Sequence, residues 1–286
     1  MKRFPSTVAG LDDILHGGLF EGGVYILEGP PGVGKTTLAN QMAYNHASAG
    51  NKTLYVTMLS ESHARMVQHM SNQTFFRKAA VNAFVFYMSG YRELENEGLK
   101  GVVSLLRSEL VRSAATLLVV DGLVVSAPGI DEGVRQFVHE LQSLVTAMNC
   151  TCLVLTTGRG NALSAEQTMV DGIFSFEDQL FKGRAERLVQ VRKFRGSEVV
   201  RGQHSFCITD EGLRFFPVWR TCPSRRANAR WRKKWCWASR KSTRSWGNPA
   251  PGREACRWWS ATAARARRSW DTASRQGPRR TSRDCC

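Results

Sequence analysis

Residues 218–286 contain no Leu, Ile, Met, Phe, Tyr or His. A folded domain needs such side chains to fill its core, so this stretch is not expected to form one. It also holds all eight tryptophans and five of the eight cysteines of the chain, whereas disordered tails are usually poor in both. The composition therefore divides the chain after residue 217 and predicts one globular domain over residues 1–217.

Residues 1–217 lack a net charge. The whole chain carries +16, but residues 218–286 hold 19 Lys and Arg against 3 Asp and Glu, which leaves 21 basic and 21 acidic residues before them. The basic total therefore indicates nothing about the partners of the globular part. Residues 1–217 also have no basic loop studded with aromatic residues, which argues against tight DNA binding.

The odd composition of residues 218–286 is typical of a GC-rich gene translated out of phase. With the reading frame shifted by one base, synonymous codons over residues 238–247 permit Ile-Pro-Glu-Val-Asp-Glu-Ile-Leu-Gly, which is close to residues 8–17. Residues 260–269 permit Gly-Asn-Ser-Gly-Thr-Gly-Lys-Thr-Ile in the same frame. Our hypothesis is that a frameshift near Pro217 replaced a second, homologous domain. The alternative is a genuine basic, Trp-rich tail that binds nucleic acid.

Further absences limit the location of the protein. Residues 1–217 have three cysteines and no C-x-x-C pair, so a zinc site is not indicated. The first residues lack the apolar segment of a signal peptide. No apolar run approaches the roughly 20 residues that span a bilayer. We expect a cytoplasmic protein without membrane contact.

Short apolar runs alternate with amphipathic segments along residues 24–156, which predicts an α/β fold with a mainly parallel sheet covered on both faces. Four further runs suggest an antiparallel C-terminal appendage. The expected strands are residues 24–28, 53–57, 83–88, 117–120, 151–156, 172–176, 187–192, 205–208 and 212–216, and the expected helices are residues 37–46, 98–115 and 131–148.

A phosphate-binding loop follows the first of these strands. The sequence fits G-x-x-x-x-G-K-[ST] without departure, and a helix is expected to follow it. Glycines let the backbone wrap a polyphosphate, the lysine reaches the β- and γ-phosphates, and the threonine hydroxyl can bind Mg²⁺. The predicted ATP-binding residues are Gly29, Pro30, Pro31, Gly32, Val33, Gly34, Lys35, Thr36 and Thr37.

Two carboxylates follow other predicted strands. Asp121 ends the strand at 117–120, where P-loop enzymes place the acid that holds Mg²⁺ through water. Thr36 and Asp121 are therefore the predicted metal ligands. Glu61 follows the strand at 53–57 and could polarise the water that attacks the γ-phosphate. The alternatives are a turn residue for Asp121 and a solvated loop residue for Glu61.

These features together resemble the KaiC branch of the RecA-like ATPases. The resemblance covers essentially all of residues 1–217 and rests on residues 6–19, the phosphate loop, residues 54–57 with Ser60 and Glu61, residues 118–121, 193–196, 201–206 and 208–213. It implies a RecA fold, MgATP hydrolysis and a ring, expected to be a hexamer, with ATP held between subunits.

The resemblance also implies residue roles. Glu61 takes the position of the catalytic glutamate, and Lys193 and Arg195 reach the γ-phosphate of a neighbouring subunit, as an arginine finger does. Many relatives carry two such domains whereas this chain has one, so autokinase activity is not carried over. Two other functions stay open: a DNA-binding, recombinase-like ATPase, and a nucleotide-binding module that does not hydrolyse ATP.

Overall fold

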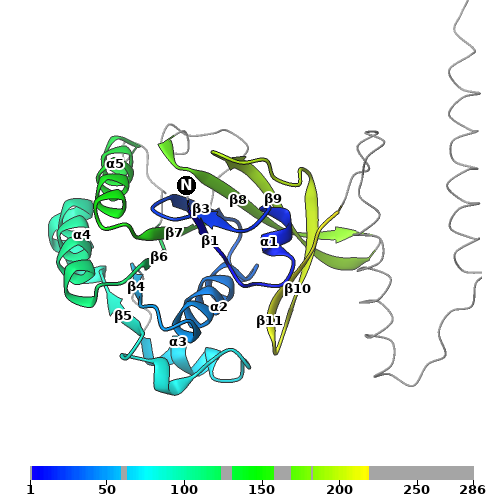
Figure 1. Ribbon diagram of the computed structural model, residues 1–286, viewed down its shortest axis with the longest axis horizontal. Coiled ribbons are helices and arrows are strands. Elements are labelled where there is room, and N and C mark those ends of the chain that lie inside the picture. Colours follow the sequence, from blue (N-terminus) through cyan, green and yellow to red (C-terminus); the bar gives the residue numbers. More distant parts are fainter. Residues whose placement is uncertain (1, 59–62, 124–130, 158–168, 182, 219–286) are drawn as a thin grey trace, which may run out of the picture. The chain divides into compact units, whose positions relative to one another are not determined.

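The computed structural model describes residues 2–58, 63–123, 131–157, 169–181 and 183–218 (Figure 1). All of them lie in the first of two units of the chain, Met1–Arg220. None of the helices among these residues is long and apolar enough to cross a membrane.

Strands and helices alternate from β3 to β7, and the named elements that follow β7 are all strands. The elements are β1 (Arg3–Phe4), α1 (Leu11–Ile14), β2 (Leu19–Phe20), β3 (Val24–Glu28), α2 (Lys35–Ser48), β4 (Thr53–Thr57), α3 (His63–Met70), the 3₁₀ turn η1 (Lys78–Ala80), β5 (Val85–Ser89), α4 (Tyr91–Ser113), β6 (Leu117–Asp121), α5 (Asp131–Ala147), β7 (Thr151–Thr156), β8 (Gly172–Phe181), β9 (Arg184–Phe194), β10 (Gln203–Thr209) and β11 (Gly212–Phe216).

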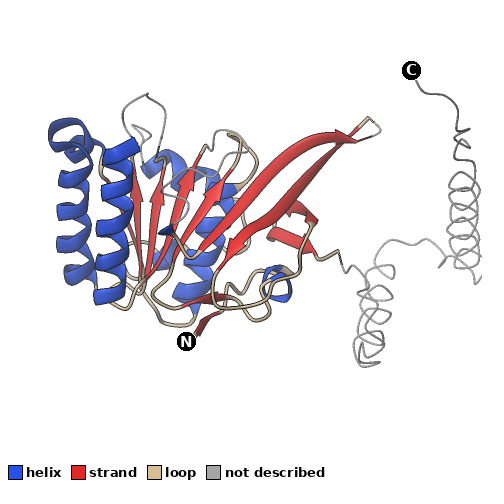
Figure 2. Cartoon of the chain, turned by 90° about the horizontal axis from the view of Figure 1, so that it is seen from above, coloured by secondary structure: helices blue, strands red, loops and turns tan. Residues whose placement is uncertain are grey.

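Nine strands form one sheet in the order β11-β10-β9-β8-β3-β7-β6-β4-β5 (Figure 2). The six strands from β8 to β5 are parallel, and β9, β10 and β11 continue the sheet in antiparallel fashion. β1 and β2 pair separately. Because the carboxyl ends of parallel strands share one edge, the residues after β3, β4 and β6 are brought together there.

Helices cover the parallel sheet on both faces, α2 on one side and α4 and α5 on the other (Figure 1). The central strands are buried throughout because both faces are covered, which explains their nearly continuous apolar sequences. Alternate residues of β3 enter different cores: Tyr25 and Leu27 pack with Leu38 of α2, whereas Val24 and Ile26 pack against the α4 and α5 side.

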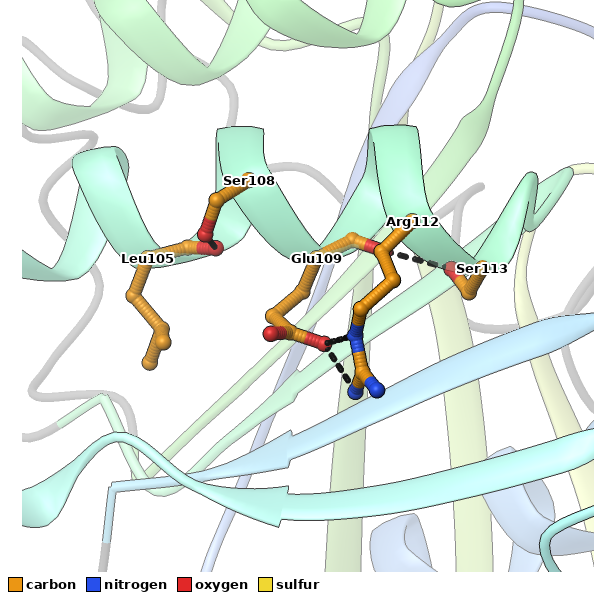
Figure 3. Close-up of polar contacts among 5 residues, drawn as sticks. All are labelled: Leu105, Ser108, Glu109, Arg112 and Ser113. Carbon is orange, nitrogen blue, oxygen red and sulfur yellow. Dashed lines mark hydrogen bonds and ion pairs between the residues drawn. The ribbon is translucent and has the colours of Figure 1, made fainter.

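The outer helix α4 bends at Gly98, whose φ of 67° and ψ of −158° are not helical. Glycine takes such a conformation because it has no Cβ. Beyond the bend, several polar side chains of α4 bond to groups of the same helix (Figure 3). Arg112 pairs with the Glu109 carboxylate, and the Ser113 hydroxyl donates to the Glu109 carbonyl.

The predicted α/β fold with a mainly parallel sheet is confirmed, and the antiparallel strands lie at its C-terminal end. They extend the main sheet, and the strand predicted at 172–176 runs parallel to β3 before β9 turns back. Four strands, β3, β4, β7 and β11, have the predicted bounds. α4 begins at Tyr91 and not at Gly98, because the helix continues across the glycine bend.

Candidate functional site

The phosphate loop lies between β3 and α2, at the carboxyl edge of the sheet. Lys35 and Thr36 begin α2, and Thr37 follows in its first turn, so the unpaired N–H groups and the dipole of the helix face the loop. The Val33 side chain is buried in the core and anchors the loop there. Pro30 and Pro31 are exposed and have no N–H to donate, so their part is to shape the loop.

Two glycines of the loop are required by their surroundings. Gly29 has a φ of 151°, and a Cβ there would collide with the carbonyl oxygen of Phe176 in β8. Gly34 has a φ of 117°, and its Cβ would lie 2.6 Å from Cδ1 of Ile208. Ile208 belongs to the β10–β11 hairpin, which therefore packs directly against the loop. Side chains are excluded at both positions by conformation and by space.

Lys35 turns its ammonium group back into the loop. Its Nζ donates to the carbonyl oxygens of Gly29 at 2.7 Å and Pro30 at 2.9 Å. Burial lowers the pKa of Lys35, and the nearby Asp121 partly opposes this effect. A partly desolvated cation held by neutral carbonyls is suited to bind an anion, because phosphate oxygens would offer it full negative charge.

Thr36 and Asp121 meet across the sheet edge, although 85 residues separate them in the chain. The Thr36 hydroxyl donates to Oδ2 of Asp121 at 2.9 Å. A hydroxyl oxygen beside a carboxylate forms a hard oxygen donor set of the kind Mg²⁺ prefers, and phosphate oxygens complete such sites in nucleotide enzymes. The residues therefore fit a magnesium ion that Thr36 would bind directly and Asp121 through water.

A buried polar chain lies beneath this pair and was not foreseen from the sequence. The Tyr55 hydroxyl donates to Oδ2 of Asp121 at 2.8 Å. Asn40 Nδ2 donates to the Thr36 carbonyl at 2.8 Å and to the Tyr55 hydroxyl at 3.3 Å, and the Tyr87 hydroxyl donates to Asn40 Oδ1 at 2.7 Å. Burial, and then the charge of Asp121, raise the pKa of Tyr55 well above its ordinary value.

A sequence signal existed for one member of this hydrogen-bonded network, Asn40. Asn40 follows Thr36 by four residues and so lies on the same face of α2. The pairing of β4 with β6, which brings Tyr55 near Asp121, is set by the tertiary structure alone.

A second unforeseen contact joins the start of the loop to β9. Glu28, the last residue of β3, pairs with Arg192 across 3.0 Å, and their side chains are 6% and 21% exposed. The sequence signal for this contact was Glu28 itself, a carboxylate at the end of an otherwise apolar strand. The pair ties the residue immediately before Gly29 to the antiparallel part of the sheet.

A hairpin from the far end of the domain closes over α2. Gln41 Oε1 accepts a hydrogen bond from the Leu213 N–H at 2.8 Å. A Cβ at Gly212 would lie 2.6 Å from the Gln41 amide, so the first residue of β11 has no room for a side chain. The β10–β11 hairpin thereby covers the loop from one side.

Of the other predicted residues, Lys193 and Arg195 do not join this group. Glu61 lies outside the described residues. Lys193 of β9 pairs with Ile173 of β8, and Ile173 pairs with Ile26 of β3. Lys193 therefore lies level with the middle of β3 and not with its loop end. Arg195 follows the end of β9 and donates to the Met169 carbonyl at 3.0 Å, at the edge of the sheet opposite to the phosphate loop.

The sheet order, the loop and its partners Thr36 and Asp121 define a RecA-like P-loop protein. Residues 4–219 match the family described as ATPase: KaiC, and the chain belongs to this family. It is 27% identical over 238 residues to the UPF0273 protein of Thermotoga maritima, an alignment that covers 76% of this chain and 97% of that one.

A second UPF0273 protein has the same identity to this chain, and a KaiC protein is matched over less than half of its own length. The UPF0273 protein PH0284 of Pyrococcus horikoshii is 27% identical over 237 residues, covering 76% of this chain and 94% of that one. The circadian clock oscillator protein KaiC of Picosynechococcus is 23% identical over 232 residues, covering 76% of this chain and 45% of that protein.

Proposed function

We propose that this chain binds MgATP at Gly29–Thr36 and hydrolyses it as a ring-forming regulatory or signalling ATPase. The observation that carries the proposal is the joint placement of Lys35, Thr36 and Asp121 at one edge of the sheet. On binding, the Lys35 ammonium exchanges two carbonyl partners for β- and γ-phosphate oxygens. Magnesium, when bound, neutralises charge that develops on the phosphates. Thr36 and Asp121 would hold it.

Glu61 is proposed to accept the proton of the attacking water. Its place after β4 supports this role, because β4 lies beside β6 and so ends near Asp121. Hydrolysis then needs the attacking water, the γ-phosphorus and the leaving oxygen roughly in line, with the Glu61 carboxylate within hydrogen-bond distance of that water.

Lys193 and Arg195 are proposed to act on the nucleotide of a neighbouring subunit. Arg195 lies near Val24, and about 13 Å of strand separates that residue from Glu28 at the loop end of β3. This placement favours contact with another subunit over contact with the chain's own loop, and a ring with ATP between subunits provides such a contact.

We also propose that the ATPase domain ends near residue 217 and that residues 218–286 result from a frameshift. The family match to residues 4–219 supports this boundary, as does the alignment that spans 97% of the Thermotoga protein but 76% of this chain. Sequencing the locus around the codons for Pro217 and Val218 tests the frameshift directly.

The nucleotide site is tested by calorimetry with MgATP and the Lys35→Ala variant. Two charge-assisted hydrogen bonds are worth roughly 1.5–3 kcal/mol each, so affinity should fall at least about 100-fold. Lys100→Ala is the matched control, because Lys100 is exposed on α4 on the other side of the sheet. Equal affinity of parent and Lys35→Ala would refute the site.

Turnover assays separate the remaining functions. Phosphate release from MgATP without DNA supports the proposal. Binding without release in a concentrated, assembled sample would identify a non-hydrolysing module. Release that depends on single-stranded DNA would identify a recombinase-like ATPase instead.

A further inference from the structure

The Asp121 carboxylate receives two hydrogen bonds on one oxygen. Thr36 Oγ1 and the Tyr55 hydroxyl lie 2.9 Å and 2.8 Å from Oδ2. Thr36 belongs to the phosphate loop, whereas Tyr55 belongs to β4 of the central sheet. The two donors come from different elements, and together they hold Oδ2 of Asp121 in place.

The surrounding chain of polar groups determines which way each proton points. Asn40 Nδ2 must be the donor, because one of its partners is the Thr36 carbonyl, which can only accept. The same nitrogen also donates to the Tyr55 oxygen, so the single Tyr55 proton is directed to Asp121. Tyr87 completes the arrangement by donating to Asn40 Oδ1.

Burial makes this network of hydrogen-bonded side chains rigid. Tyr55 and Asn40 are fully buried, and the Tyr55 ring packs against that of Tyr87 with centroids 5.3 Å apart. Alternative rotamers would leave buried polar atoms without partners, which costs more than the bond itself contributes. The Tyr55 hydroxyl is therefore a fixed donor and not an adaptable one.

We propose that Tyr55, held by Asn40, is a positioning residue that orients Asp121 toward Mg²⁺. The inference rests on the proposed MgATP site and assigns to it an outer layer from β4 and α2. Groups that hydrogen-bond to metal-binding side chains commonly change metal affinity by about 10–100-fold when they are removed. Tyr55 itself would touch neither the nucleotide nor the metal.

The test is the effect of Mg²⁺ on ADP binding, measured by calorimetry with excess Mg²⁺ and with EDTA. In Tyr55→Phe, the strengthening of ADP binding by Mg²⁺ should fall about tenfold, while affinity in EDTA stays within about twofold of the parent. Tyr87→Phe removes a hydroxyl that is two hydrogen bonds further from Asp121 and should reduce the strengthening by about threefold or less. Mn²⁺ in place of Mg²⁺ adds a spectroscopic signature, since electron paramagnetic resonance reports its free fraction.

Tyr25→Phe is the matched control. Tyr25 is also fully buried, and its hydroxyl bonds to the N–H and the carbonyl of Phe20 in β2. Its removal should leave the strengthening by Mg²⁺ unchanged. A general structural effect would instead lower ADP affinity equally with Mg²⁺ and with EDTA in the Tyr55→Phe variant, and this would overturn the inference.

Unchanged strengthening in folded Tyr55→Phe, as judged by its circular dichroism, would also overturn it. Failure of the proposed function looks different, because the parent itself would then bind ADP in neither condition.

Discussion

The ion pair between Glu28 and Arg192 gives the sharpest energetic prediction. Arg192→Met removes the guanidinium 3.0 Å from a carboxylate whose side chain is 6% exposed. Breaking a buried pair from one side costs about 3–5 kcal/mol. Because the Arg192 side chain is 21% exposed, water stabilises part of the pair already, and we expect a loss of about 2–3 kcal/mol.

Urea denaturation followed by circular dichroism measures this loss. For a domain of this size the loss corresponds to a fall in Tm of roughly 4–12 °C. Glu28→Gln keeps an acceptor for Arg192 and should cost about 1 kcal/mol. The double variant should lose less free energy of unfolding than the sum of the losses of the two single variants, by at least about 1 kcal/mol. The reason is that the double variant contains neither charge.

MgATP affinity should fall in Arg192→Met as well, because Glu28 directly precedes Gly29 of the phosphate loop. The matched variant is Arg112→Met on α4, because the Arg112 side chain is 72% exposed, although that of its partner Glu109 is 16% exposed. It should change stability by less than about 1 kcal/mol. The reasoning would be refuted by an Arg192→Met variant within about 0.5 kcal/mol of the parent, or by strict additivity in the double variant.

Three further predictions concern assembly, pH and chain length. Glu61→Gln and Arg195→Ala should each lose turnover, and mixing them should restore part of it, because each protomer supplies what its neighbour lacks; phosphate release is the measurement. Burial lowers the pKa of His46 to about 4 despite the opposing charge of Glu21, so the unfolded chain takes up a proton first as the pH falls below about 6.5. The full pKa shift corresponds to roughly 3 kcal/mol, but the ring is partly exposed, so we expect a loss of about 1–2 kcal/mol in stability between pH 6.5 and 4. Urea denaturation measures this loss, which should be absent in His46→Gln. Ending the chain after Val218 should keep the fold and ATP binding and raise solubility, since it removes eight tryptophans and five cysteines; Val218 stays because its N–H donates to His204 Nδ1.

Each of these has a control. Rescue by mixing must rise with protein concentration, since rings form by mass action. Its absence in a sample where the two variants co-assemble would contradict action between subunits. His69 is exposed on α3, and His69→Gln should keep the pH dependence of the parent. A shortened chain that no longer folds would contradict the boundary at residue 217.

Local sequence predicted the elements around the site well. The strand before the loop, the glycines and the helix after them follow from short-range rules, since a run of apolar residues, a turn and a helix start are decided by neighbours in the chain. The positions of Lys35 and Thr36 at the start of α2 follow from the same rules. Asp121 was predicted as a metal ligand because acids at strand ends of such folds meet the phosphate loop.

Contacts between distant residues were beyond these rules. Nothing near Tyr55 in the sequence indicates that its hydroxyl meets Asp121, because that contact depends on β4 lying beside β6. The pair of Glu28 with Arg192 likewise depends on β8 and β9 joining the sheet next to β3.

By itself, then, the sequence determined the P-loop α/β fold and where its phosphate loop lies. Strand order and register, which only the tertiary structure decided, selected the partners of that loop. The physical reason is that hydrophobic periodicity specifies which face of a strand is buried but not which strand lies beside it.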